Sequence, residues 1–123
     1  MTKFSMMFVH NNKHFLAVSR KNDLTKFGLP GGAIDPGETP MQAAIRETFE
    51  ETGIVVEECV LVHATDDSRY FFATKWSGEI DTKEVGIVKW GVYEDFVNKD
   101  AAFPANNIAA FAGLTYCFPE MKL

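Results

Sequence analysis

The sequence predicts an α/β (α+β) fold in which a mixed β-sheet is packed between helices. Three observations lead to this prediction: several β-rich apolar runs, one strongly amphipathic helical segment between them, and a second helical segment near the end. The 123 residues suit a single domain, residues 1–123. A hydrophobic content of 46% with 24% charged residues is typical of a globular protein, not of a disordered chain.

The first elements are two β-rich runs, residues 3–10 and 14–20, which are expected to form a hairpin. The turn is placed near Asn11 and Asn12, since asparagine is favoured in tight hairpin turns. Residues 21–28, KNDLTKFG, are expected to form a polar loop that leads into the turn sequence LPGG.

Residues 39–53 form the clearest helix in the sequence. Thr39 is the expected N-cap, Pro40 occupies the first helical position, and Gln42 completes a capping box. Gly53 stands where a left-handed residue commonly ends a helix. The remaining elements are expected to be strands at 54–65, 69–76 and 84–93, a short helical turn at 94–99, and a closing helix at 106–117.

The helix at 39–53 has two faces when its residues are placed about 100° apart. The face expected to be buried has Thr48 near its middle and consists of Met41, Ala44, Ile45, Thr48, Phe49 and Thr52. The opposite face carries Arg46 and three glutamates, Glu47, Glu50 and Glu51, whose spacing brings the carboxylates together within one turn. Taken alone, such a face is more typical of a solvated helix surface.

The residues before this helix favour a cation site. Gly31 and Gly32 allow the backbone to approach a ligand closely and can leave a carbonyl oxygen facing the carboxylates. Carboxylates and a backbone carbonyl are hard oxygen donors, which suit Mg²⁺ or Mn²⁺. Arg46 lies one turn before Glu50 and can orient the acidic cluster.

Composition argues against several other classes of protein. The formal net charge is −5 and no run of Lys or Arg offers a track for phosphates, so a nucleic acid polymer is not expected as partner. No apolar run approaches the roughly 20 residues that span a membrane, and the first residues do not resemble a signal peptide. Cys59 and Cys117 are expected to be free thiols in a reducing, cytoplasmic location. The sequence leaves monomer and homodimer open.

The stretch 32–54 resembles the Nudix box, G-x5-E-x7-R-E-U-x-E-E-x-G-U, in which U is a bulky aliphatic residue. The fixed positions are filled, at the correct spacing, by Gly32, Glu38, Arg46, Glu47, Glu50, Glu51, Gly53 and Ile54. Thr48 departs from the pattern at the first U, but it lies on the face expected to be buried, so this change concerns packing. The resemblance to the Nudix hydrolase family implies a Nudix-type α/β/α sandwich over most of the chain.

The resemblance also implies a reaction and a set of roles. Nudix hydrolases typically cleave a nucleoside diphosphate linked to another group, with Mg²⁺ as cofactor and Mn²⁺ as an alternative. The implied metal-binding groups are the carbonyl of Gly32 and the carboxylates of Glu47, Glu50 and Glu51. Glu38 and Arg46 are expected to orient these groups. Glu47 and Glu84 are both candidates for the general base, and Glu84 can equally be a solvated glutamate at a strand edge.

Residues 94–106, EDF…FPAN, resemble the DDFPPAN segment of MutT-type nucleoside triphosphate pyrophosphohydrolases. This resemblance places Asn106 at the edge of a nucleobase, whereas the simpler alternative is that Asn106 or Asn107 caps the last helix. Arg20 and Lys21 match basic residues near the substrate phosphates, or are ordinary charges at a strand end. Phe72 is a candidate to stack on a base, although core packing also explains it.

The leading hypothesis is therefore a Mg²⁺-dependent pyrophosphohydrolase that converts a (deoxy)nucleoside triphosphate, for example the oxidised purine 8-oxo-dGTP, to the monophosphate and pyrophosphate. One alternative is a Nudix hydrolase of dinucleoside polyphosphates or nucleotide sugars. Another is a Nudix domain that senses nucleotides without hydrolysing them. The last is an acidic helix with a purely structural role.

Overall fold

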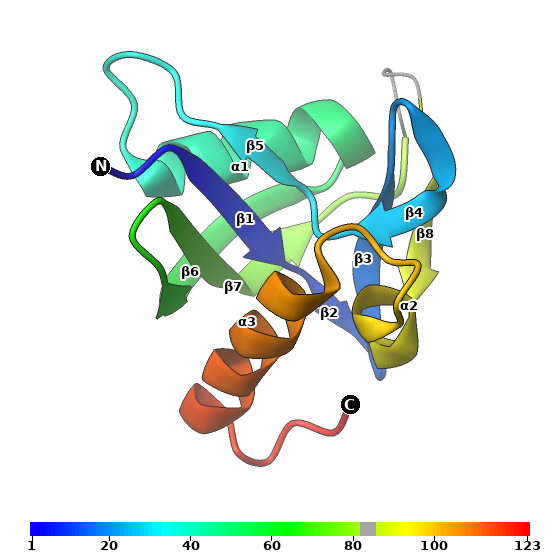
Figure 1. Ribbon diagram of the computed structural model, residues 1–123. Coiled ribbons are helices and arrows are strands. Elements are labelled where there is room, and N and C mark those ends of the chain that lie inside the picture. Colours follow the sequence, from blue (N-terminus) through cyan, green and yellow to red (C-terminus); the bar gives the residue numbers. More distant parts are fainter. Residues whose placement is uncertain (82–85) are drawn as a thin grey trace.

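The computed structural model describes residues 1–81 and 86–123, and its strands form two sheets flanked by helices (Figure 1). The first sheet has the order β5-β1-β7-β6, and its strands are Gly31–Ala33, Phe4–Phe8, Ser68–Ser77 and Val55–Ala64. The second has the order β2-β3-β4, with β8 also paired to β3, and its strands are His10–Asn11, His14–Arg20, Asp23–Gly28 and Val88–Gly91. The helices are α1 (Pro40–Thr52), α2 (Tyr93–Val97) and α3 (Pro104–Cys117).

The first sheet is mixed, because β1 runs parallel to β7 and antiparallel to β5. Figure 1 shows α1 and α3 on opposite sides of this sheet. Successive side chains of β1 point to opposite faces: Met7 packs in a cluster with Ala44 of α1, and Phe8 packs in a cluster with Phe111 of α3. The predicted fold class, a mixed sheet between helices, is confirmed. No helix in residues 1–81 and 86–123 is long and apolar enough to cross a membrane.

The ends of α1 follow the prediction from the sequence. The amide of Gln42 donates to the hydroxyl of Thr39 at 3.1 Å, and the side chain of Gln42 accepts from the Thr39 amide at 2.9 Å. Pro40 begins the helix, and Gly53 ends it with φ = 82°, in the left-handed region. These four residues fix both ends of the helix that carries the acidic cluster.

The buried face of α1 differs from the predicted one. Its buried residues are Ala43, Ala44, Thr48 and Thr52, so Thr48 is buried as expected, but Met41 and Phe49 are 40% and 47% exposed. The helix is turned so that Ala44 packs in a cluster with Met7 of β1, whereas Met41 and Phe49 lie outside this cluster. Thr48 satisfies its hydroxyl by donating to the carbonyl of Ala44 at 2.7 Å.

The first strands also differ from the prediction. The expected polar loop at 21–28 contains β4, and β1 does not pair with β3. The hairpin is limited to β2 and β3, where His10 faces Phe15, and its turn residues Asn12 and Lys13 have φ of 50° and 69°. Positive φ at both central residues is the geometry that matches the twist of a two-residue hairpin. Sequence periodicity indicates a strand but not its partner, and here β1 pairs with β5 and β7 instead.

Ser5 lies in β1 with a completely buried side chain, and its hydroxyl has no hydrogen-bond partner within the part of the chain that the structure describes. A buried hydroxyl without a partner destabilises the folded state. We therefore expect Ser5→Ala to raise the free energy of unfolding by about 1 kcal/mol in urea titrations.

Ser68 provides the matched control for this prediction. Its hydroxyl is also buried but donates to Asp67 Oδ1 at 3.0 Å, so Ser68→Ala should lower the free energy of unfolding. A decrease for Ser5→Ala as large as that for Ser68→Ala would contradict the assignment of an unsatisfied hydroxyl.

Candidate active site

The backbone of β5 lies directly against the acidic side of α1. The amide of Gly31 donates to Glu51 Oε1 at 3.0 Å. A Cβ atom added to Gly32 would lie 2.9 Å from Glu47 Cδ and 3.1 Å from each of its carboxylate oxygens. At position 32 only glycine leaves room for the Glu47 carboxylate, and the Gly31 amide binds Glu51 directly, so the backbone of β5 lies within the acidic cluster.

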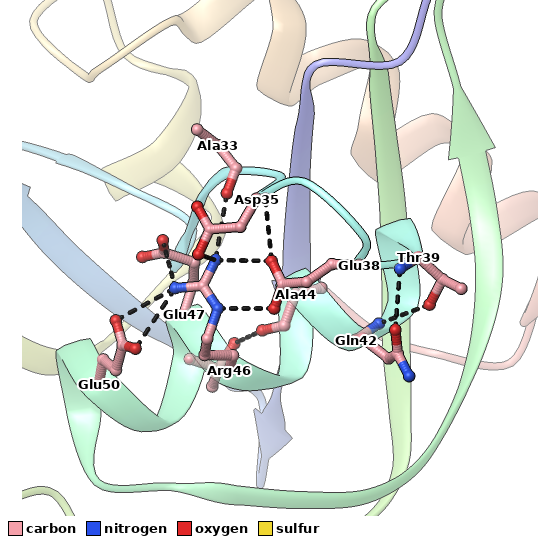
Figure 2. A network of polar contacts seen from close by, with 10 residues as sticks. Ala33, Asp35, Glu38, Thr39, Gln42, Ala44, Arg46, Glu47 and Glu50 are labelled. Carbon is pink, nitrogen blue, oxygen red and sulfur yellow. Dashed lines mark hydrogen bonds and ion pairs between the residues drawn. The ribbon is translucent and has the colours of Figure 1, made fainter.

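Arg46 is the centre of a network that joins α1 to the preceding loop (Figure 2). Its guanidinium binds Glu38 through two nearly parallel hydrogen bonds of 2.7 and 2.9 Å. Nη1 also donates to Glu47 at 3.0 Å and to Glu50 at 3.2 Å. Nη2 lies 3.3 Å from the carboxylate of Asp35 and 3.3 Å from the carbonyl oxygen of Ala33. One planar cation therefore fixes the positions of several carboxylates.

The network changes the protonation behaviour of its members. Hydrogen bonds from the Arg46 side chain, and then from the backbone amide of Asp35, lower the pKa of the Glu38 carboxyl. The same contact with Glu38, supported by Glu47 and Glu50, raises the pKa of Arg46 above its ordinary value. Glu38 is therefore an ionised structural partner of Arg46 and is poorly suited to accept a proton.

A dependence of stability on pH follows from the lowered pKa of Glu38. An ionised carboxylate that is stabilised only in the folded state raises the free energy of unfolding at pH values above the ordinary glutamate pKa. This contribution disappears as the pH falls through the lowered pKa of the folded state. Glu38→Gln should therefore destabilise the protein more at pH 7 than at about pH 4 in urea titrations. Equal destabilisation at the two pH values would show that the Glu38 charge contributes nothing.

The donor set fits a hard divalent cation in its chemistry, since carboxylate oxygens and the backbone of Gly32 are close together. Within residues 1–81 and 86–123, however, no three His, Cys, Asp or Glu side chains are arranged as a metal site. Figure 2 shows the guanidinium of Arg46 in contact with the carboxylates of both Glu47 and Glu50. Each of these carboxylates has further lone pairs, so a cation could bind Glu47 and Glu50 while both stay bound to Arg46.

We expect Gly32→Ala to impair activity more than stability. The added Cβ would meet the end of the flexible Glu47 side chain, which can move aside without disturbing the backbone. A displaced carboxylate should lower kcat about 10- to 100-fold, with little change in melting temperature. Gly37→Ala is the comparison, because its Cβ would meet nothing within 4 Å but its φ of 85° disfavours alanine. Gly37→Ala should lower the melting temperature and leave kcat unchanged. If Gly32→Ala lowered the melting temperature and left kcat unchanged, the role of Gly32 would be contradicted.

A cavity of about 670 Å³ opens beside the acidic helix and brings several of the predicted site residues together. Gly32 and Glu51 lie on its wall, as do Arg20, Lys21 and Asn106. Phe72 is not part of that wall, because its ring packs against Phe118 with the ring centroids 4.8 Å apart. Glu84 lies outside the described residues, so its candidacy as general base stays a prediction.

The cavity wall also includes residues that the sequence reasoning missed, among them Phe103. Phe103 is 62% exposed, has φ = 54°, and lies with its ring centroid 4.9 Å from the guanidinium carbon of Arg20. A positive φ is rare for an aromatic residue and is often found at binding sites. The closing helix was expected to begin at residue 106, and nothing in the sequence indicated this backbone conformation for Phe103.

Asn106 and Asn107 have different environments although they are neighbours in α3. Asn106 is exposed on the cavity wall, whereas Asn107 is only 5% exposed. Neither caps the helix, which begins two residues before Asn106, at Pro104, with Phe103 as its N-cap and no side-chain capping bond. The alternative prediction that one of these asparagines caps the last helix is therefore wrong.

The fold and the acidic network define a Nudix domain, and comparison with known proteins agrees. A family model described as the NUDIX domain matches residues 2–111. The chain belongs to the Nudix family and is related to MutT-like hydrolases.

Individual relatives support this assignment. A protein of Bacillus subtilis (strain 168) is 29% identical over 97 residues, which cover 72% of this chain and 65% of that protein. The 8-oxo-dGTP diphosphatase of Proteus vulgaris is 34% identical over 84 residues, which cover 61% of this chain and 75% of that protein. Relatives named for other Nudix substrates match as well.

The fold has a counterpart among solved structures. The crystal structure of the MutT NUDIX hydrolase from Burkholderia pseudomallei superposes with a TM-score of 0.71 at 24% identity, covering 90% of this chain and 97% of that one. The architecture is thus that of MutT structures.

Proposed function

We propose that this Nudix hydrolase, as a single domain, converts a (deoxy)nucleoside triphosphate to the monophosphate and pyrophosphate, with a purine nucleotide such as 8-oxo-dGTP as substrate. The observation that carries this proposal is the single cavity lined by Gly32 and Glu51 of the acidic site, by the basic residues Arg20 and Lys21, and by the amide of Asn106. These groups offer contacts for the phosphates and for a base within one site.

We assign different residues of the cavity wall to the phosphates and to the base of the substrate. Arg20 and Lys21 provide positive charge for the phosphates, which a planar guanidinium can bind through two hydrogen bonds. Asn106 offers one donor and one acceptor to a base edge. The name of the Proteus vulgaris relative, an 8-oxo-dGTP diphosphatase, supports an oxidised purine nucleotide as the first substrate to test.

The acidic side of the cavity supplies the reacting centre. We assign the cation-binding groups to the carbonyl of Gly32 and to the carboxylates of Glu47, Glu50 and Glu51. A divalent cation, Mg²⁺ or Mn²⁺, would neutralise the phosphoryl oxygens and lower the pKa of the attacking water. Arg46 holds Glu47 and Glu50 in position, and Glu47 and Glu84 are the two candidates to take the proton from water.

The experiment that tests this function is a panel of canonical and oxidised nucleoside triphosphates, assayed separately for phosphate and pyrophosphate. We expect pyrophosphate and a monophosphate as products, with turnover abolished by EDTA and restored by Mg²⁺. The same panel should include a dinucleoside tetraphosphate and a nucleotide sugar, since a relative is named as a bis(5′-nucleosyl)-tetraphosphatase.

Two outcomes would overturn the proposal. Cleavage of a dinucleoside polyphosphate or a nucleotide sugar without cleavage of any triphosphate would assign the chain to the Nudix hydrolases that act on those substrates. Binding of a nucleotide in saturating Mg²⁺ without any turnover would indicate a sensor.

A further inference from the structure

The amide nitrogen of Asn107 is fully engaged in holding the start of α3. Nδ2 donates to the carbonyl of Phe96 at 2.9 Å and to the carbonyl of Ala102 at 2.8 Å. A carboxamide has two N–H donors on its nitrogen, so both are used. Because a carbonyl can only accept, these contacts also fix which end of the amide is nitrogen and which is oxygen.

The oxygen of this amide remains available at the cavity. Asn107 is 5% exposed and is one of the residues on the cavity wall. Within the described part of the chain no donor contacts Oδ1, and the only fully enclosed side-chain nitrogen or oxygen there without a partner is Ser5 Oγ, so Oδ1 is not fully enclosed. Since Nδ2 is directed at the two carbonyls, the small accessible part of Asn107 places Oδ1 at the cavity surface.

We propose that Asn107 is a specificity-determining residue whose Oδ1 accepts a hydrogen bond from an N–H group on the base of the bound nucleotide. This inference rests on the proposed function. Within the described residues the side-chain amide of Asn106 makes no hydrogen bond, so it can present either its oxygen or its nitrogen. The amide of Asn107, by contrast, cannot rotate without breaking both bonds to carbonyl oxygens. Asn107 therefore presents an acceptor only.

A fixed acceptor selects the chemistry of the base. A guanine-type base carries two adjacent donors, the ring N1–H and the exocyclic amino group, which can meet the oxygens of Asn106 and Asn107 together. A purine without amino or ring N–H donors on this edge would leave the buried oxygen of Asn107 without a partner. A site built for such a hydrogen bond discriminates against an analogue that lacks it.

The experiment compares dissociation constants of deoxynucleoside monophosphates by calorimetry, so that it does not depend on turnover. The ligands are dGMP and purine-2′-deoxyriboside monophosphate, which lacks the amino group and the N1–H. We expect the wild type to bind dGMP about 10- to 100-fold more tightly than the analogue. In Asn107→Ala this ratio should fall to about threefold or less.

The control is Asn98→Ala. The side-chain nitrogen of Asn98 also donates to a helix carbonyl, that of Glu94 at 2.8 Å, but Asn98 is not on the cavity wall. Its removal should leave the ratio at the wild-type value. If Asn107→Ala does not fold, as judged by circular dichroism, Asn107→Ser takes its place, because a hydroxyl can still donate to one of the two carbonyls.

A wild-type ratio close to one, or a wild-type ratio retained in the folded Asn107 variant, would overturn the role of Asn107. Such a result accompanied by normal hydrolysis of triphosphates would leave the proposed function intact. Failure to bind or hydrolyse any nucleotide would instead mean that the proposed function is wrong, and the role of Asn107 with it.

Discussion

Glu51→Gln is expected to lower kcat by about 10³-fold while leaving the fold intact. Glu51 Oε1 accepts a hydrogen bond from the amide of Gly31, and the carbonyl oxygen of glutamine can accept the same bond. The substitution therefore removes a negative charge but keeps the local structure. If Glu51 binds a divalent cation, the loss of charge weakens binding and leaves the phosphoryl oxygens less well neutralised.

The measurements are kcat at saturating substrate and the affinity for Mn²⁺ by titration calorimetry. Glu57→Gln serves as the control, because it changes the net charge by the same amount as Glu51→Gln. Glu57 is an exposed glutamate on β6 and is not part of the cavity wall. Glu57→Gln should retain wild-type activity. If Glu51→Gln kept more than about a tenth of the wild-type kcat, the assignment of Glu51 to the reacting centre would be abandoned.

Arg46→Lys is expected to lower kcat about 10- to 100-fold, because Arg46 positions the carboxylates and does not itself touch the substrate in this proposal. Lysine has a single ammonium group and cannot hold Glu38 through two bonds while also contacting Glu47 and Glu50. The melting temperature should fall as well, since the carboxylates would lose part of their neutralising partner. Arg46→Ala should show a larger decrease in both quantities.

Arg69→Lys is the matched control for the arginine substitution. Arg69 Nη1 donates to the carbonyls of Thr65 and Ser68 at 2.7 and 2.9 Å, so it is also hydrogen-bonded but lies outside the acidic network. Its substitution should leave kcat unchanged. A wild-type kcat in folded Arg46→Lys would show that the two-bond contact with Glu38 has no part in positioning the acidic cluster.

The parts of the structure that could be predicted from the sequence are those determined by local chemistry. The capping box of Thr39 and Gln42 and the left-handed Gly53 both depend on residues close together in the chain. The residues that line the cavity depend on tertiary packing. Arg20 and Asn106 were identified only through family resemblance, and the structure places both on that wall.

Other features could not be predicted because they depend on distant partners. The ring of Phe72 packs on Phe118, which strand alternation alone cannot reveal, and Phe103 is exposed through a backbone conformation that its residue type disfavours. The difference between Asn106 and Asn107 likewise depends on two carbonyl groups, those of Phe96 and Ala102, that only the folded chain brings together.

The position of β1 between β5 and β7 has a consequence for how the protein assembles during synthesis. Phe4 pairs with Ala33 of β5 on one side and with Ser68 of β7 on the other. The ribosome therefore synthesises β5 soon after β1, and β7 much later. Contacts between residues so far apart in the chain form slowly. Because the cavity wall includes Gly32 of β5, Tyr70 of β7 and Asn106 of α3, a nascent chain on the ribosome should complete the cavity only after α3 has emerged.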